Sequence, residues 1–178
     1  MQQLQPEQAH FLLHNFYMPS LKNEHRITKS VMQAIPVDKG DYRPNDIAMS
    51  AVDLAWHIAW AESMFMNTVV NAAFNPTAFK RPDSIQTSAD VLKWYEQTFA
   101  QGFEQLGNTP AEQLTKIVDF RGVMQQPAVM YLSFLLNHSI HHRGQLSVYL
   151  RPMGAKVPVI YGESYDSKQA AKEMQPTA

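Results

Sequence analysis

The sequence contains no cysteine. This absence excludes disulfides, thiolate metal sites and cysteine nucleophiles, so any metal ligands must be imidazole nitrogens or oxygen atoms. No apolar run reaches the length of a membrane span, and the opening stretch MQQLQPEQAH lacks the charged and apolar regions of a signal peptide. We therefore expect a cytoplasmic protein that makes no contact with a membrane.

The chain also lacks an excess of charge of either sign. Fifteen Lys and Arg residues stand against sixteen Asp and Glu residues, which gives a net charge of -1, and no block of like charges occurs. Nucleic-acid binding depends on clustered Lys and Arg that neutralise phosphates, so we expect no nucleic-acid partner. The 178 residues, 45% of them hydrophobic, suffice for one globular domain. We assign residues 1–162 to that domain and residues 163–178 to a polar C-terminal tail.

Strand patterns are almost absent, whereas four segments have helical periodicity. The first is interrupted at Pro19, which cannot donate a backbone hydrogen bond, and Ser88 or Asp90 is the expected cap of the third. A short extended piece, KIVDF, is expected before the fourth segment. This pattern predicts an all-α four-helix bundle with long crossover connections. The four segments span about residues 6–34, 50–74, 88–106 and 127–151.

The stretch LLNHSIHHRGQL, residues 135–146, is the strongest indication of chemistry. Residues four apart share one face of a helix, so His138 and His142 point the same way, along an inward-facing stripe. Two buried imidazoles without partners cost about 1 to 3 kcal/mol each, and a shared metal ion removes that cost. His57 is the only histidine of the second segment and is the candidate third ligand. Three protein ligands leave a coordination position open, as in catalytic sites.

Simpler interpretations of these residues stay open. His57 could be an ordinary hydrogen-bonded core residue, and two histidines four apart also arise by chance. Gln145 either contacts a ligand histidine or a substrate, or is a buried amide bonded to the backbone. Asp53 either orients an imidazole through a hydrogen bond, as metal-bound histidines require, or caps its helix. Gly144 is expected to mark the close approach of another helix, and Arg143 to form an ion pair or an interface contact.

Three further histidines, and the second side of the fourth segment, need separate explanations. We expect His10, His14 and His25 to lie at the surface or to bridge helices. A helix that is apolar on both sides needs a second partner, and we favour another copy of the chain, which makes a homodimer. The apolar residues on that side are Leu132, Leu136 and Ile140.

Several separated motifs resemble those of the DinB/YfiT-like family of metal-binding bundle proteins. HSIHHRGQL matches its H-x3-HRGQ signature, and RPMGAKVPVIYG is similar to the ending that follows it there. IPVDKGDYRP and SAVDLAWHIAWAE resemble the segment that leads to the family's first metal histidine. The resemblance covers roughly residues 20–162. It implies a bundle in up-down-down-up order, often dimeric, with a three-histidine divalent metal site on His57, His138 and His142.

The resemblance also suggests reactions. Some members of the family transfer low-molecular-weight thiols, and others have been regarded as hydrolases. The sequence offers no clear general acid or base beside the histidines, because Glu62 points away from His57 on a helical wheel. Thiol transfer therefore ranks before hydrolysis, with a non-catalytic metal-binding stress-response protein as the alternative. Imidazole ligands suit zinc, nickel, iron or manganese, so the identity of the metal stays open.

Overall fold

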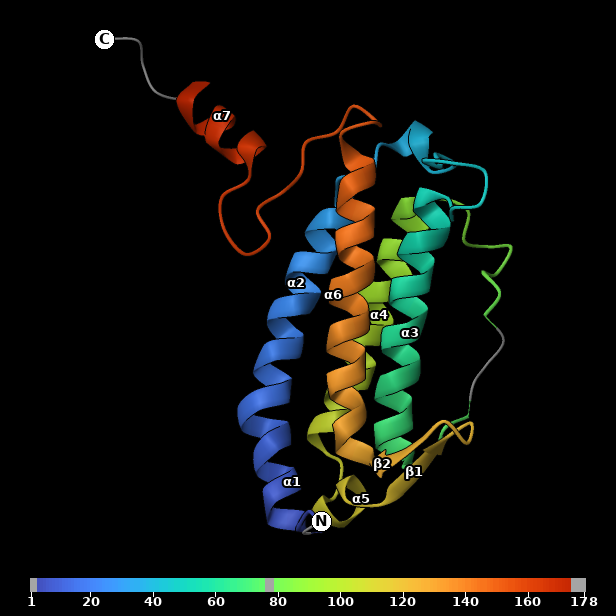
Figure 1. Cartoon of the computed structure of the whole chain (residues 1–178), viewed down its shortest axis with the longest axis vertical. Helices are drawn as coiled ribbons and strands as arrows, with labels where there is room; N and C mark the ends of the chain where they lie inside the picture. The colour runs from blue at the N-terminus through green and yellow to red at the C-terminus, as the bar shows by residue number, and fades with distance from the viewer. Residues whose placement is uncertain (1–2, 76–78, 174–178) are drawn as a thin grey trace.

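Four long helices form the body of the molecule (Figure 1). The computed structural model describes residues 3–75 and 79–173. Helices α2 and α6 run upward in Figure 1, whereas α3 and α4 run downward. The predicted all-α bundle and its up-down-down-up order are therefore confirmed. The helices span Met18–Gln33 (α2), Ala51–Asn71 (α3), Ser88–Gly107 (α4) and Tyr131–Leu150 (α6).

The first helical segment is continuous through Pro19, where an interruption was expected, and its winding changes directly before that residue. Helix α1, Pro6–Leu12, passes into a π-helical stretch, η1, Leu13–Tyr17, and then into α2. Pro19 lies in the first turn of α2. It has no N–H to donate to the carbonyl four residues earlier, and its ring clashes with that carbonyl. A wider π turn directly before it accommodates this interference.

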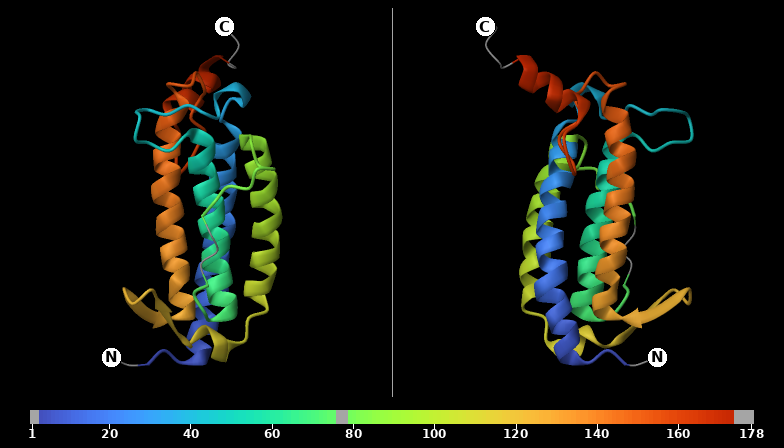
Figure 2. Two further views of the ribbon diagram at one scale, coloured as in Figure 1. Left: turned by 90° about the vertical axis from the view of Figure 1, so that its right-hand side faces the viewer. Right: turned by 60° about the vertical axis from the view of Figure 1, so that its left-hand side comes forward.

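Helix α3 begins where Ser50 caps it, because the Ser50 hydroxyl accepts the Asp53 N–H at 3.2 Å. The helix ends at Ala72, which adopts a left-handed conformation with φ of 47°. The connection to α4 then runs back alongside α3, so that α3 and α4 are parallel (Figure 2). Long crossovers of this kind were expected from the breakers in residues 75–88.

Helix α4 begins with a capping box. The hydroxyl of Thr87 accepts the backbone N–H of Asp90, and the Asp90 carboxylate accepts the backbone N–H of Thr87 at 2.9 Å. The prediction that Ser88 or Asp90 is the capping residue is therefore wrong: Thr87 caps the helix, Ser88 is its first residue, and Asp90 completes the capping box from inside the helix. The cap lies one residue earlier because only Thr87 has the extended backbone that a capping residue needs.

The lower end of the bundle is closed by small elements. Helix α5, Ala111–Leu114, leads into an antiparallel hairpin of β1, Ile117–Phe120, and β2, Met124–Pro127. The extended piece KIVDF is therefore confirmed, although its partner strand was not foreseen. A short 3-10 helix, η3, Ala128–Met130, precedes α6, so α6 begins four residues later than expected.

The C-terminal tail contains more structure than its polar composition suggested. Helix α7, Tyr165–Glu173, follows the bundle and has no buried residue. It is held near α6 because Asp166 accepts hydrogen bonds from Arg151 at 3.2 Å and from the Val157 N–H at 2.9 Å. Figure 1 shows α7 beyond the upper end of the bundle.

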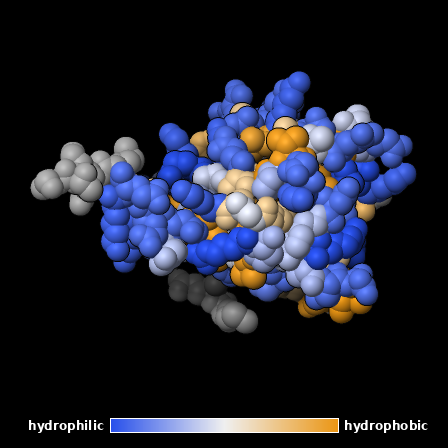
Figure 3. Space-filling model, turned by 90° about the horizontal axis from the view of Figure 1, so that it is seen from above, coloured by the Kyte–Doolittle hydropathy of each residue, from blue (hydrophilic) through white to orange (hydrophobic). Residues whose placement is uncertain are grey.

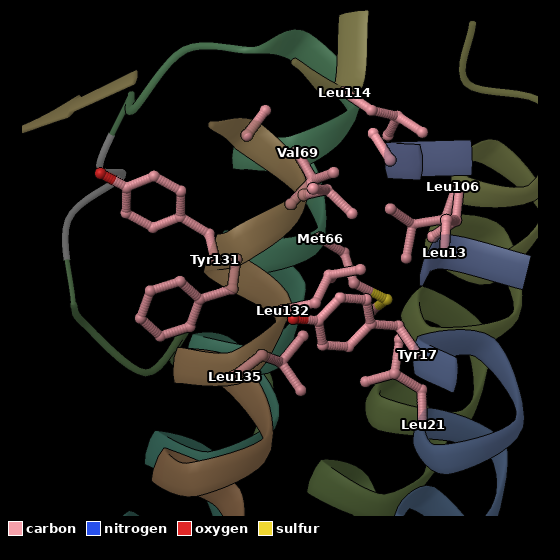
Figure 4. Packing of buried hydrophobic residues seen from close by; sticks show 14 of the residues in the cluster. Leu13, Tyr17, Leu21, Met66, Val69, Leu106, Leu114, Tyr131, Leu132 and Leu135 are labelled. Atoms are coloured by element: carbon pink, nitrogen blue, oxygen red, sulfur yellow. The ribbon is translucent and has the colours of Figure 1, made fainter. Parts of the chain in front are cut away.

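The interior divides into a lower and an upper hydrophobic cluster. The lower cluster joins α1, α2, α3, α4, α5 and α6 around residues such as Leu13, Met66 and Leu132 (Figure 4). The upper cluster includes Trp56, Ile58 and other residues near the start of α3. Charged and hydroxyl side chains lie in the core as well, at Thr28, Glu62, Ser139 and Arg143.

The second apolar side of α6 is largely covered within one chain. Leu132 is fully buried, Leu136 is partly buried, and Ile140 is 38% exposed. The argument that this side needs a second subunit is therefore wrong for Leu132, because α2 packs against α6 and fills the space.

The end of the bundle where α2 stops and α3 begins is mostly hydrophilic, with small hydrophobic patches between (Figure 3). Among the described residues, no helix combines the length and the apolar character that crossing a membrane requires.

Candidate metal centre

Three histidines meet between two neighbouring helices. His57 comes from α3, and His138 and His142 come from successive turns of α6. One ring nitrogen from each lies within 4.8 Å of the others. The Nε2 atoms of His57 and His142 are 3.1 Å apart, and all three side chains are half-buried. The structure thus brings together the three residues that the sequence singled out, in a group that could hold a metal ion.

The geometry and the chemistry of these donors fit a divalent ion. Two imidazole nitrogens that each bind zinc at about 2.0 to 2.1 Å in a tetrahedron lie about 3.3 Å apart, close to the distance between His57 and His142. The Nδ1 atoms of His57 and His138 are buried and have no hydrogen-bond partner among the described residues. Imidazole nitrogens are common ligands of divalent transition metals, so three rings gathered at one point suit such an ion.

The electrostatics keep the imidazoles neutral. Burial, followed by the neighbouring His142, lowers the pKa of His57 to about 4. Burial and the surrounding histidines lower the pKa of His138 to about 3. The pKa of His142 is lowered as well, mainly by burial. Neutral imidazoles carry the lone pairs that a metal ion needs, so protons compete little with a metal near neutral pH.

Gln145 fixes the orientation of one ring. The Nδ1 of His142 lies 2.6 Å from the side-chain oxygen of Gln145, three residues later on α6. Because an amide oxygen only accepts, the His142 proton sits on Nδ1 and the lone pair of Nε2 faces His57. The contact that the sequence suggested between Gln145 and a histidine is present, and Gln145 is exposed rather than a buried amide.

Asp53 does not contact the imidazoles. Its carboxylate accepts the Ser50 hydroxyl at 2.6 Å and pairs with Arg81 at 3.1 Å and Arg43 at 3.4 Å. The proposed role in orienting an imidazole is therefore corrected: Asp53 lies in the first turn of α3, where a carboxylate is stabilised by the helix dipole and by these cations. The alternative interpretation placed Asp53 at the capped beginning of its helix, and the structure has it in the first turn of α3.

The two residues between His142 and Gln145, Arg143 and Gly144, have different environments: one is buried and the other is exposed. Arg143 is only 1% exposed and forms an ion pair with Glu24 of α2 at 2.6 Å, as one of its two interpretations predicted. It also donates to Thr28 and to Tyr161. Gly144 was expected to mark the close approach of another helix, and this is wrong within the chain: a Cβ there would meet no atom within 4 Å.

The other histidines stay outside the group. His10 and His14 touch each other on the outer side of α1 and η1, with ring centroids 4.2 Å apart, which fits the expected surface position. His25 bridges helices instead: its ring stacks on Phe99 of α4, 3.7 Å between centroids, and burial lowers its pKa to about 4. His141 is exposed, and its ring lies next to that of His142, with centroids 4.8 Å apart.

Two aromatic residues at the site were not identified from the sequence. The ring of Phe79, in the crossover, lies edge-on to His57 with centroids 5.1 Å apart, and it contacts Trp60 at 5.2 Å. Trp60 follows His57 by three residues, so helical spacing could have placed it beside the site. No local sequence signal could have identified Phe79, because the spacing of residues in a long connection does not determine its path in space.

Glu62 points away from His57, as the helical wheel indicated. Its side chain is buried on another side of α3, where its carboxyl accepts the Tyr95 hydroxyl at 2.7 Å. Across the described chain, no Asp or Glu joins the three histidines in a metal-binding group.

Comparison with known proteins gives consistent relatives. The model of the DinB family matches residues 9–176. The uncharacterized protein YjoA of Bacillus subtilis strain 168 is 29% identical over 149 residues, which cover 82% of this chain and 88% of YjoA. The uncharacterized protein YrdA of the same strain is 32% identical over 110 residues, 61% of this chain and 64% of YrdA.

Two crystal structures share the fold. That of YjoA, a DinB-like protein, superposes with a TM-score of 0.69 at 23% identity and covers 83% of this chain and 99% of its own. A DinB-like protein from Bacillus cereus ATCC 10987 gives a TM-score of 0.71 at 22% identity, covering 83% of this chain and 97% of its own.

Proposed function

The chain belongs to the DinB family, and three half-buried histidines meet at one point in its structure. We propose that the protein binds a divalent metal ion at these histidines and that it is a metal-dependent thiol transferase. The ligands are His57, His138 and His142, and the ion is zinc, nickel, iron or manganese. The observation that carries the proposal is the convergence of three neutral imidazoles from two helices, with no fourth protein ligand in the described group. Three ligands leave a position for an exchangeable group.

The protein groups around the ion have separate tasks. A bound divalent ion would supply a Lewis acid that lowers the pKa of a thiol or water at the open position. Gln145 holds the His142 ring in the tautomer that presents Nε2. Phe79 and Trp60 place apolar surface beside His57, which reduces the access of water.

Thiol transfer is favoured over hydrolysis by the absence of a base in the described group. Hydrolysis of a stable bond usually requires a carboxylate or histidine that moves protons at the reacting atoms. Of the two acids of α3, Glu62 is hydrogen-bonded to Tyr95 in the core and Asp53 is paired with Arg43 and Arg81. A low-molecular-weight thiol needs less assistance, because a metal ion suffices to favour its thiolate form.

Removal of one ligand tests the proposal. We expect His142→Ala to lose most of the bound metal, measured by elemental analysis of protein purified without a histidine tag. His141→Ala is the matched control, since His141 is adjacent and exposed but outside the group, and it should keep the metal. Wild-type metal content in His142→Ala would refute the ligand assignment.

The alternative is a metal-binding protein that does not turn over, for example in a stress response. Exchange at the fourth position separates the two. We expect the visible spectrum of the cobalt-substituted protein to change on addition of a small thiol, because the thiol enters the open position. A spectrum that thiols leave unchanged would indicate a closed site and favour the non-catalytic role.

We also propose that the protein is a homodimer. The outer side of α6 carries exposed Phe134, Ile140 and Val148 next to Gly144. Since nothing in the described chain covers Gly144, a second copy of the molecule can approach the helix closely there.

A further inference from the structure

A hollow of about 240 Å³ begins at Trp60, one helical turn after His57, and lies between α3, α4 and the beginning of the crossover. Its floor follows one side of α3, where Trp60, Met64, Asn67 and Asn71 succeed one another at helical spacing after His57. Figure 2 shows the crossover running alongside this helix. Pockets for whole ligands measure roughly 300 to 1,000 Å³, so this hollow suits one ring-sized part of a ligand.

Among the described residues, no charged side chain lines the hollow. Its polar groups are neutral hydroxyls and amides, and several have unused hydrogen-bonding capacity. The side chains of Ser63 and Asn67 make no hydrogen bond within residues 3–75 and 79–173, and neither does that of Asn75. Asn71 donates its amide to the Asn67 carbonyl at 2.9 Å, which leaves its own side-chain oxygen as an acceptor. An ion would find no compensating charge there, whereas a neutral polar group would find both donors and acceptors.

Two indoles provide the apolar part of the walls. Trp60 lies on α3 and Trp94 on α4, and both are only partly buried. Large flat side chains beside amides suit a ligand that has an apolar face and a polar edge. Phe79 contacts both His57 and Trp60, so it links the histidine group to the Trp60 side of the hollow.

From these contacts we propose that the hollow binds an uncharged ring that carries several hydroxyl or amide groups. The ring packs against Trp60 and Trp94, while Ser63, Asn67 and Asn71 hydrogen-bond its edge. Because the hollow begins one helical turn after His57 of the proposed metal site, it would hold the part of a substrate that does not touch the metal. This assignment rests on the proposed function. Sugar rings and amide-bearing heterocycles share this chemistry.

The binding test uses matched neutral and charged probes. Methyl glucoside and nicotinamide are titrated into the metal-free protein, and NMR follows the indole N–H signals of Trp60 and Trp94 and the side-chain amide of Asn67. We expect at least one neutral probe to shift all three signals, and its charged analogue, glucuronate or nicotinate, to bind at least about tenfold more weakly. The neutral probe that binds identifies the ring type. No shift with either neutral probe at millimolar concentration, or equal binding of a charged analogue, would overturn the proposal.

Substitutions place the probe in the hollow. Asn71→Ala should weaken binding about threefold to tenfold, the effect of one lost neutral hydrogen bond. Asn15→Ala is the control: Asn15 is also exposed and also donates to the carbonyl four residues earlier, but lies on η1 outside the hollow. Equal effects of the two substitutions would contradict the assignment.

The histidine variant separates this inference from the metal site. Probe binding should persist unchanged in His142→Ala, because His142 does not line the hollow. If the wild-type protein proves to bind no metal, the probe result still decides whether the hollow is a binding site. Loss of probe binding in His142→Ala would contradict a hollow that binds by its own residues.

Discussion

At the level of single residues, Gln145 decides which nitrogen of His142 faces the other imidazoles. The amide oxygen accepts from Nδ1 at 2.6 Å, and the resulting tautomer points the Nε2 lone pair toward His57. Hydrogen bonds of this kind orient metal-binding histidines and raise their basicity. A side chain outside the histidine group therefore fixes the ring orientation of one of its members.

We expect Gln145→Ala to weaken metal affinity about 10-fold to 100-fold, because the His142 ring loses its fixed tautomer and orientation. Competition with a chromophoric chelator measures the change. Gln145→Glu keeps an acceptor oxygen near Nδ1 and should retain most of the affinity. An affinity unchanged in Gln145→Ala would show that packing alone orients the ring.

At the level of elements, α3 carries different chemistry on two of its sides. One side presents His57 to His138 and His142 of α6, and another buries Glu62 against Tyr95 of α4. Burial raises the pKa of Glu62 to about 7, against the hydrogen bonds and the nearby Arg143, which lower it. The carboxyl is thus mostly protonated below neutral pH and fits the core as a neutral group.

The raised pKa has a defined consequence for stability. In the unfolded chain Glu62 ionises near its ordinary pKa of 4.5, whereas in the folded protein it keeps its proton up to about pH 7. The stability contributed by the neutral carboxyl is complete below about pH 4.5 and is lost as the pH rises through about 7. Glu62→Gln cannot ionise and should therefore gain stability relative to wild type as the pH rises.

Urea unfolding of the metal-free proteins at about pH 5 and about pH 8 measures this difference. Comparing variant with wild type at each pH cancels the contributions of the buried histidines, which titrate in both proteins. Glu104→Gln, on the exposed side of α4, should show no such trend. A difference between Glu62→Gln and wild type that is the same at both pH values would contradict the buried neutral carboxyl.

At the level of the whole molecule, the group of three histidines lies at the border between core and solvent. The three histidines are half-buried, and the exposed apolar residues of α6 begin directly beside them. A dimer formed through this side of α6 would place two metal centres close to the subunit interface.

Light scattering after size exclusion tests the dimer. We expect twice the chain mass of 20.3 kDa for wild type and a shift toward the monomer for Val148→Glu, which places a charge on the exposed side of α6. Ile117→Glu is the control, because Ile117 is also exposed but lies on the hairpin. A monomeric wild-type protein, or equal effects of both substitutions, would contradict the interface.

Local spacing determined much of this protein. The separation of four between His138 and His142 places both rings on one helix face in any α-helix, and the turn residues around each segment delimit the four helices. Pro19 likewise marked where the regular hydrogen bonding of the first helical segment is disturbed, because a proline cannot donate a backbone hydrogen bond. Features of this kind depend only on neighbours in the chain.

Only the tertiary structure decided what lies opposite each face. The pairing of α3 with α6 brought His57 to the other imidazoles, the path of the crossover brought Phe79 over them, and the arginines beside the start of α3 drew Asp53 away. Gly144 faces open space because no element within residues 3–75 and 79–173 passes it. Contacts between distant segments follow from how whole helices pack, and one-dimensional spacing does not contain that information.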